Sequence, residues 1–585
     1  MTTLELFNAV VAKESTQQTY ISSDGFLIVP EAIWAAKQIL AHYKKEKLNG
    51  NDLNKTFHKS WNKILTTPQS ALVVEQIRHY ISTYGSNFQA EMYIPLETLN
   101  IPELKLTYKV IRAFSKEEMT DRCLAMLQSG IALKEETVDS LITVLADELD
   151  YEFTGKEGIR NKEAICKIGD LYNVYPENAT EFLRYVVYKT TGETLLIKNK
   201  NLIQLIKDGS FNPVIAFRQF GLERLAEIFN RFKPLFLAYK KRASKTINKI
   251  SKLSKTLHKP LVSNALNEVT QRFLTDTDIH WLDNATPFAL FKALNACNAR
   301  ANGQDAFVYR IRSGKSWVTE NPTKKKSINK HNYKFITNYM KQRFDLSGKS
   351  VFLPKNVNFA LPTSEKMFSG NFPCGTVFTG KKLAVGIYWE NSWGTKDLDL
   401  SGINIGGKVG WNADYEQGGS LIFSGDMTNA PTGACEYLYA RDGLVEPTLV
   451  KNNIYPSGDK ESDFKIIIGK GSSVTKDFMM NPNKLMAEIK TKTAQKESYI
   501  GLLMPKGELQ QFILLNFGAS ELRVSGNSDM AAVATKALVQ QWSNTVSFNK
   551  MVKLLGAEIV DTPIGVDYDF SLSEITKDSF INIFK

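Results

Sequence analysis

The spacing of apolar residues changes near residue 305, and this change limits most strongly how the chain can fold. Upstream of it, apolar residues recur at helical spacing, as at Leu72, Val73, Ile77 and Ile81. Downstream, short β-branched runs alternate with Gly-rich polar turns, which is typical of antiparallel strands. We therefore predict an α+β multidomain chain with a helical N-terminal array, an antiparallel β-sandwich and a helical C-terminal tail.

The segment 178–192 gives the clearest single helix prediction. Asn178 can cap the helix, and Glu181 follows three residues later, just before a run of apolar residues. Gly192 stands where such a helix would end. Helices are expected to about residue 300, broken at Pro176, Pro213, Pro234 and Pro260.

The second half of the chain predicts a hairpin and then a series of strands. Residues 305–319 alternate around an SGK turn, and a helix is expected over 331–343. The expected strands are KLAVGIYWE, DLDLSGINI, GSLIFSGD, DFKIIIGKG, ESYIGLLMP and QQFILLNFG. We expect helices at 529–542 and 547–555 and a strand at AEIVDT. The predicted domains are 1–110 (helical), 111–304 (helical and basic), 305–369 (basic connector), 370–528 (sandwich) and 529–585 (tail).

Cysteine usage and the absence of targeting signals predict a cytoplasmic location. The 585 residues include 5 cysteines, an odd number, and they are scattered without any CxxC spacing. Such thiols are typical of a reducing compartment, with each cysteine buried on its own. The N-terminal segment has no apolar signal core. No apolar run is long enough to predict a transmembrane helix.

The positive charge is concentrated in one stretch. Residues 231–349 hold 24 Lys and Arg against 7 Asp and Glu, a net charge of +17. Because the whole chain carries +12, the remainder carries −5. Residues 231–259 contain no acid and predict an amphipathic basic helix. Its candidate anion-binding residues are Lys240, Lys241, Arg242, Lys245, Lys249, Lys252 and Lys255.

Three interpretations of this basic helix remain open. It can follow the phosphates of RNA or DNA, since each lysine that contacts a phosphate releases a counterion. It can lie on an anionic membrane surface. It can also be the solvated face of a helical domain.

Local motifs for catalysis are absent from the sequence. Two SGKS strings begin at Ser313 and Ser347, but the first glycine of a phosphate-binding loop is replaced by Tyr309 and Arg343. The 6 histidines form no HxxxH pair, and no GxSxG elbow occurs. We therefore assign no catalytic residue and favour a protein that is not an enzyme, with an enzyme whose site has no local motif as the remaining alternative.

Four acids in the predicted sandwich form the strongest candidate site. Asp397 and Asp399 are two residues apart on one strand, so their side chains share a face. Asp426 ends a second strand and Glu436 begins a third, while Asn429 lies between them. Carboxylates brought together in this way suit calcium, which takes six to eight oxygen ligands. Alternatively, these acids cap turns and accept hydrogen bonds from backbone amides.

The motif DLDLS followed by SGDMTNAPTGACE resembles the core of the TerD family, calcium-binding β-sandwich domains of bacterial tellurite-resistance and stress proteins. The resemblance spans roughly residues 370–545. It implies that Asp397, Asp399, Asp426 and Glu436 hold one or two calcium ions. The loop here has fewer acids than is usual in that family, which implies weaker binding or a single ion.

These observations favour a binding or scaffold protein that holds calcium and contacts a protein partner. The segments IRHYIST, ATEFLRYVVYKTTGE, SEKMFSGNFPCG and FNKMVKLLGAEIVD resemble large bacterial and phage proteins with a helical region before a TerD-like domain. This wider resemblance implies a fold and not an activity, and stress response or phage–host interaction are the roles considered with it. The alternatives are an RNA- or DNA-binding protein that acts through residues 231–259, and a structural component of a virion. The sequence defines neither the partner nor the oligomeric state.

Overall fold

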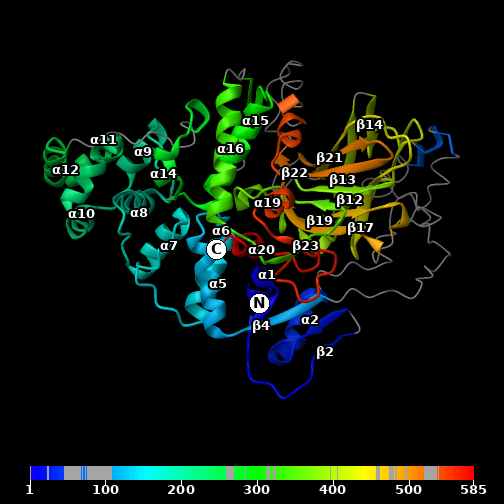
Figure 1. Ribbon diagram of the computed structural model, residues 1–585, viewed down its shortest axis with the longest axis horizontal. Coiled ribbons are helices and arrows are strands. Elements are labelled where there is room, and N and C mark those ends of the chain that lie inside the picture. The colour runs from blue at the N-terminus through cyan, green and yellow to red at the C-terminus, as the bar shows by residue number, and fades with distance from the viewer. Residues whose placement is uncertain are drawn as a thin grey trace, which may run out of the picture.

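The structure is a computed structural model of the 585-residue chain. The residues that it describes are 2–22, 25–44, 67–68, 70–72, 74–75, 109–257, 269–283, 285–310, 316–320, 325–394, 397–404, 406–455, 462–473, 480, 484–493, 497–518, 536–537 and 539–584. The chain is of the α+β class, with helices gathered on one side and antiparallel sheets on the other (Figure 1).

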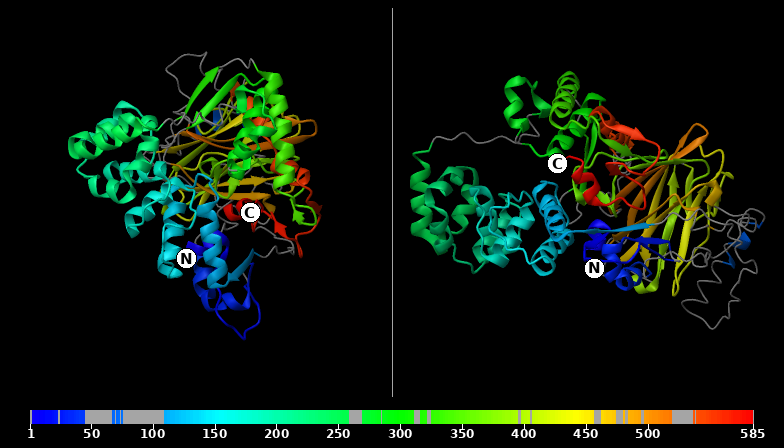
Figure 2. Two further views of the ribbon diagram at one scale, coloured as in Figure 1. Left: turned by 60° about the vertical axis from the view of Figure 1, so that its left-hand side comes forward. Right: turned by 60° about the horizontal axis from the view of Figure 1, so that its bottom comes forward.

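One group of helices forms a unit with its own core. Phe182, Phe217 and Phe236 are buried at its centre, in a cluster separate from the rest of the molecule. Figure 2 shows this unit standing apart from the sheets. Its helices are α8 (Ala179–Thr191), α9 (Lys200–Asp208), α10 (Val214–Phe220), α11 (Leu222–Ala238) and α12 (Lys240–Ser254).

The helix predicted from residues 178–192 is confirmed together with its caps. The side chain of Asn178 accepts hydrogen bonds from the amides of Thr180 and Glu181 at the start of α8. Gly192 ends the helix with a left-handed φ of 73°, a conformation that glycine adopts without the steric cost of a Cβ. Local sequence therefore fixes both ends of α8.

The N-terminal region contains a sheet as well as the expected helices. The strands lie in the order β1-β4-β3-β2, and β4 pairs in parallel with both β1 and β3. They are β1 (Ala9–Val11), β2 (Tyr20–Ile21), β3 (Phe26–Ile28) and β4 (Lys109–Phe114), accompanied by α1 (Thr2–Phe7) and α2 (Ala36–Lys44). Three of these strands have only two or three residues, too few for alternation to be visible in sequence.

The middle of the molecule joins segments from both ends of the chain. Its helices are α5 (Lys116–Gln128), α6 (Glu135–Thr143), α7 (Lys162–Tyr172), α15 (Pro287–Ala301), α16 (Lys326–Arg343), α19 (Phe548–Leu554) and α20 (Lys577–Asn582). A parallel sheet, β23-β7-β24, ties β7 (Ser350–Phe352) to β23 (Glu558–Val560) and β24 (Tyr568–Asp569). The C-terminal tail is therefore part of the central core, where Phe570, Phe580 and Phe584 are buried.

Two antiparallel sheets form the other half of the molecule. The seven-stranded sheet runs β14 (Gly407–Gly410), β13 (Asp397–Asn404), β18 (Thr448–Tyr455), β21 (Glu497–Lys506), β22 (Leu509–Gly518), β11 (Val377–Gly380) and β8 (Val357–Asn358). The six-stranded sheet runs β15 (Glu416–Gln417), β16 (Leu421–Phe423), β17 (Ala434–Ala440), β12 (Ala384–Trp389), β19 (Ser462–Gly469) and β20 (Ala487–Thr493).

The two sheets pack face to face. A Cβ placed on Gly402 of β13 would lie 2.9 Å from Leu438 of β17, so the strands approach closely at this point. All six predicted strand segments form strands, and all their neighbours in these sheets are antiparallel. The sandwich architecture expected from the spacing of strands and turns is thus present.

Several smaller predictions are confirmed. Residues 306–310 (β5) pair with 316–320 (β6) as a hairpin, and its SGK turn lies outside the described residues. All five cysteines are buried, as expected. The helix expected over 547–555 is present as α19, and Ser547 caps it. Residues 529–535 of the other predicted tail helix lie outside the described residues. No helix in the described part of the chain is long and apolar enough to cross a membrane.

Candidate functional site

Three aspartates meet at one edge of the sandwich. Asp397 and Asp399 share one face of β13 and are 1% and 2% exposed. Asp426 follows β16, and the positive φ of Gly425 (99°) turns the chain into this buried position. Carboxylate oxygens of the three residues lie within 4.8 Å of one another. We call Asp397, Asp399 and Asp426 the aspartate cluster.

Glu436 lies beside the aspartate cluster and links two parts of the chain. It is fully buried on β17, and its two oxygens accept backbone hydrogen bonds from Leu400 and Met427, each at 2.7 Å. Glu436 thereby fixes the edge of β13 to the loop that carries Asp426. The structure brings together all four predicted acids, but gives Glu436 the role of positioning the others.

The burial of these acids shifts their pKa values upward. The pKa of Asp399 is raised to about 9. Desolvation is the largest cause, and the negative charges of Asp397 and Asp426 add to it. Desolvation also raises the pKa of Glu436 well above its usual range, against the lowering effect of its two backbone hydrogen bonds. A nearby cation would reverse these shifts, because it favours the ionised carboxylates.

The aspartate cluster offers oxygen atoms that can take a cation. Oδ1 of Asp399 is buried and has no hydrogen-bond partner among the described residues. The β13–β18 register places Asn453 directly opposite Asp399, so the two side chains share a face. Asn453 Oδ1 is likewise buried without a partner in that part of the chain. Carboxylate and amide oxygens are ligands of hard cations such as calcium.

Asn429, the fifth predicted ligand, is held elsewhere in this structure. It is exposed, and its Oδ1 accepts a hydrogen bond from Asn391 Nδ2 at 2.7 Å. Asn391 also accepts a hydrogen bond from the amide of Ala430 at 2.9 Å. These contacts anchor the loop that follows Asp426, and the three-residue aspartate cluster does not include Asn429.

Lys408 on β14 is the cation that lowers the pKa of Asp399. Desolvation and Lys451 in turn lower the pKa of Lys408, while Asp399 and Glu497 raise it. Lys408 stacks over Trp411 at 5.2 Å and donates a hydrogen bond to Asn412. Sequence reasoning missed Lys408 and Asn453, because only the pairing of β14 and β18 with β13 brings them near the aspartates.

Within the predicted basic stretch 231–259, residues 240–254 form the helix α12, while residues 231–238 belong to α11. Ile247 and Ile250 are buried, while six lysines on or next to the helix are exposed, and the described residues form no ion pair with them. We call these lysines the lysine stripe: Lys240, Lys241, Lys245, Lys249, Lys252 and Lys255. Hydrophobic packing therefore orients α12 so that the lysines face solvent.

Arg242 does not belong to the lysine stripe. Its guanidinium donates a hydrogen bond to the carbonyl of Ile206 and stacks over Tyr239 at 5.4 Å. Tyr239 is itself buried against Thr190, so its ring is not available to stack on a nucleic-acid base. Both side chains hold α12 to the helices beneath it.

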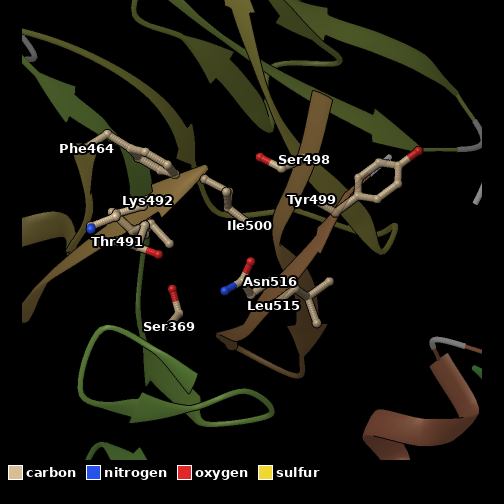
Figure 3. A pocket seen from close by; sticks show the side chains of 10 residues that line it. Ser369, Phe464, Thr491, Lys492, Ser498, Tyr499, Ile500, Leu515 and Asn516 are labelled. Atoms are coloured by element: carbon tan, nitrogen blue, oxygen red, sulfur yellow. The ribbon is translucent and has the colours of Figure 1, made fainter. Parts of the chain in front are cut away.

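A small hollow opens elsewhere in the sandwich, among β9 (Phe368–Ser369), β19, β20, β21 and β22. Its cavity volume is about 10 Å³, room for about one water molecule and far below a typical ligand pocket. The hydroxyls of Ser369 and Ser498 are buried without hydrogen-bond partners among the described residues. Figure 3 shows Lys492 and Tyr499 pointing away from its centre. The described residues that line the hollow include no acid and no histidine, so the aspartate cluster remains the stronger candidate.

Comparisons of the chain with known protein families, with curated protein sequences and with solved structures found no match. The resemblance of the DLD and SGD motifs to the TerD family therefore stays a prediction.

Proposed function

We propose that this chain is a non-enzymatic binding protein that holds a calcium ion at the aspartate cluster. One observation supports this most strongly: three buried aspartates bring their oxygens within 4.8 Å of one another, and Asp399 Oδ1 has no partner among the described residues. Without a cation, such carboxylates repel one another in a poorly solvated site. A bound divalent ion removes this repulsion.

Asp397, Asp399 and Asp426 would hold the ion, with Asn453 in reach as a neutral oxygen ligand. Calcium supplies charge neutralisation and a link between β13 and the loop after β16. Glu436 already ties these two segments together through Leu400 and Met427. An ion that binds the folded arrangement stabilises it, and thereby rigidifies the loop as a docking surface for a partner.

Titration calorimetry of the full chain with calcium, after chelation and dialysis, tests this proposal. We expect saturable binding to the parent, and a loss of at least about tenfold in affinity for Asp399→Asn, since a charged ligand becomes neutral. Magnesium should bind more weakly, because it requires a tighter octahedral arrangement.

Asp442→Asn is the matched control, because Asp442 is a 73% exposed aspartate that pairs with Lys382. It should bind calcium as the parent does. If the parent gives no saturable heat with calcium, or if both variants bind equally well, the assignment of the aspartate cluster is wrong.

A second candidate function is binding of RNA or DNA by the lysine stripe. The observation that favours it is that all six lysines are exposed and form no ion pair with described residues. A row of such cations follows a phosphate backbone by releasing its counterions.

Single-stranded oligonucleotide binding at several salt concentrations tests this candidate. We expect the affinity of the parent to fall steeply with salt, by a log–log slope of roughly 0.7 for each phosphate contacted. Replacing Lys241, Lys245, Lys249 and Lys252 by Gln should abolish binding. Affinity that ignores salt, or that survives the four changes, would contradict a nucleic-acid role for α12.

A further inference from the structure

A short segment, residues 269–275, is clamped onto α16 by two asparagines of that helix. Asn332 Oδ1 accepts a hydrogen bond from the amide of Leu274 at 2.9 Å. Asn329 Nδ2 donates to the carbonyl of Thr270 at 3.2 Å. Both asparagines are fully buried, and buried amides of this kind are held by the hydrogen bonds that they make. These contacts therefore fix the backbone of the segment on α16.

The clamped segment carries an exposed aromatic ring. Phe273 is 51% exposed, although the next residue, Leu274, is buried. The ring of Phe273 contacts His331 of α16, with 5.2 Å between the ring centroids and 75° between the ring planes. His331 stacks in turn on Phe335 at 6.1 Å, and its Nε2 donates to the carbonyl of Leu274 at 2.9 Å. Phe273 is thus held in place at the surface by the segment and by His331.

Exposed lysines follow α16 beside this ring. Lys326, Lys330 and Lys334 succeed one another at intervals of four residues, so they lie on one side of the helix, about 6 Å apart along its axis. Lys334 also lies three residues after His331 and is therefore its neighbour on the helix surface. The described residues form no ion pair with Lys330 or Lys334.

The acids that follow the clamped segment leave this positive charge largely uncompensated. Asp278 is engaged by Arg272 at 2.5 Å and by the amide of Thr275 at 2.8 Å. Asp276 is the exposed acid of the short helix η3 (Asp276–Asp278). The three lysines of α16 therefore outnumber the one exposed acid of η3. Cations beside an exposed ring suit the phosphates and the unpaired bases of a nucleic-acid strand.

We propose that Phe273, with His331, Lys330 and Lys334 beside it, is a stacking platform for an unpaired base of a nucleic-acid strand. This inference rests on the second candidate function, nucleic-acid binding by the lysine stripe, and adds that the ligand is single-stranded. The base stacks on the exposed ring, and the lysines contact neighbouring phosphates. Figures 1 and 2 show α16 apart from α12, so a strand that contacts both surfaces has to extend beyond the lysine stripe.

An anionic membrane fits this surface less well than a single strand does. Binding in a membrane interface uses an extended apolar face, whereas residues 269–279 expose two large apolar side chains, those of Phe273 and Ile279. One ring beside separate lysines matches the alternation of base and phosphate along a strand.

Fluorescence anisotropy of a labelled single-stranded oligonucleotide, with a duplex of the same length in parallel, tests the proposal on the full chain. We expect Phe273→Ala to weaken binding of the single strand at least about fivefold, since stacking one base on a ring contributes that much, and to leave duplex binding unchanged. Phe273→Tyr, which keeps a ring, should bind within about twofold of the parent. The matched control is Tyr20→Ala, which removes a 42% exposed ring from β2 and should bind as the parent does.

The salt dependence supplies a second readout. Phe273→Ala should weaken binding by the same factor at every salt concentration, because stacking releases no counterions, and should melt at the parent temperature, because the ring is exposed. Lys330→Gln combined with Lys334→Gln should instead reduce the log–log slope by roughly 0.7 for each lysine.

The outcomes separate this inference from the second candidate function. A parent that binds no oligonucleotide overturns both. A parent that binds, while Phe273→Ala keeps its affinity or loses single strand and duplex alike, overturns the stacking platform alone. The platform is also wrong if Tyr20→Ala loses as much affinity as Phe273→Ala, or if Phe273→Ala abolishes binding to phosphatidylserine vesicles without affecting the oligonucleotide.

Discussion

The acids of the sandwich and the lysines of α12 are both groups of like charge, but they lie in opposite environments. Asp397, Asp399 and Asp426 are buried within 4.8 Å of one another, whereas the lysine stripe projects into solvent. Water screens the lysines, so their repulsion costs little. The buried acids lack that screening, and their pKa values rise. A group of like charges therefore indicates an ion site where it is buried, as in the aspartate cluster, and a solvated surface where it is exposed, as in the lysine stripe.

The largest effect on the free energy of unfolding is expected at Glu436, the buried acid beside the aspartate cluster. Glu436→Ala leaves the buried backbone amide of Leu400 and the partly buried amide of Met427 without their acceptor. The free energy of unfolding should fall by about 2 to 6 kcal/mol, measured by urea denaturation. The control Glu508→Ala removes an 88% exposed acid whose partner, Lys381, is itself 65% exposed, and should change stability by less than about 1 kcal/mol. If the two variants lost the same free energy of unfolding, the buried Glu436 would not differ from an exposed glutamate in its contribution to stability.

The dependence of stability on pH should also differ between the two regions. Because the folded-state pKa of Asp399, about 9, exceeds the ordinary 3.8, the folded state keeps a proton that the unfolded chain releases. This stabilisation is complete below pH 3.8 and is lost as the pH rises toward 9. The chelated parent should therefore have a lower urea midpoint at pH 8 than at pH 6.

Asp399→Asn should weaken this pH dependence, whereas the quadruple Gln variant of the lysine stripe should keep it. Saturating calcium should also weaken it in the parent, since the ion favours the ionised carboxylates. A parent whose midpoint is the same at both pH values, with and without calcium, would contradict the charge coupling inferred for the aspartate cluster.

A smaller effect is expected at Lys408, which introduces a positive charge beside the acids. Lys408→Met removes the cation that lowers the pKa of Asp399 but keeps an unbranched side chain over Trp411. Calcium affinity should rise several-fold, because an approaching ion no longer meets a positive charge. Titration calorimetry measures the change, and Lys382→Met, which alters a lysine paired with Asp442, is the control. If Lys408→Met left the calcium affinity unchanged, Lys408 would not act on the ion site.

The smallest effect on stability is expected at the lysine stripe. Changing any one of Lys241, Lys245, Lys249 or Lys252 to Gln should shift the free energy of unfolding by less than about 0.5 kcal/mol, since the side chains are exposed. Ile250→Ala, on the buried face of the same helix, should cost about 2 to 5 kcal/mol. A large loss from a lysine change would show that the stripe contributes to packing.

Features fixed by nearby residues could be predicted from the sequence, and features fixed by distant pairing could not. The caps of α8 and the strand β13 follow from local spacing. The sheet β1-β4-β3-β2 was missed because β4 joins strands more than 80 residues upstream. Lys408 and Asn453 reach the aspartates only through strand register. Arg242 shares the sequence pattern of the stripe, yet its contact with Ile206 turns it inward.

The most direct test of the account is thermal unfolding of the full chain with and without calcium, for the parent and for Asp397→Asn combined with Asp399→Asn. Calcium at about one hundred times its dissociation constant should stabilise the parent by about 2.7 kcal/mol, seen as a rise in melting temperature. The double variant should melt at the same temperature in calcium and in chelator. A parent whose melting temperature does not respond to calcium would contradict the central claim that the aspartate cluster holds the ion.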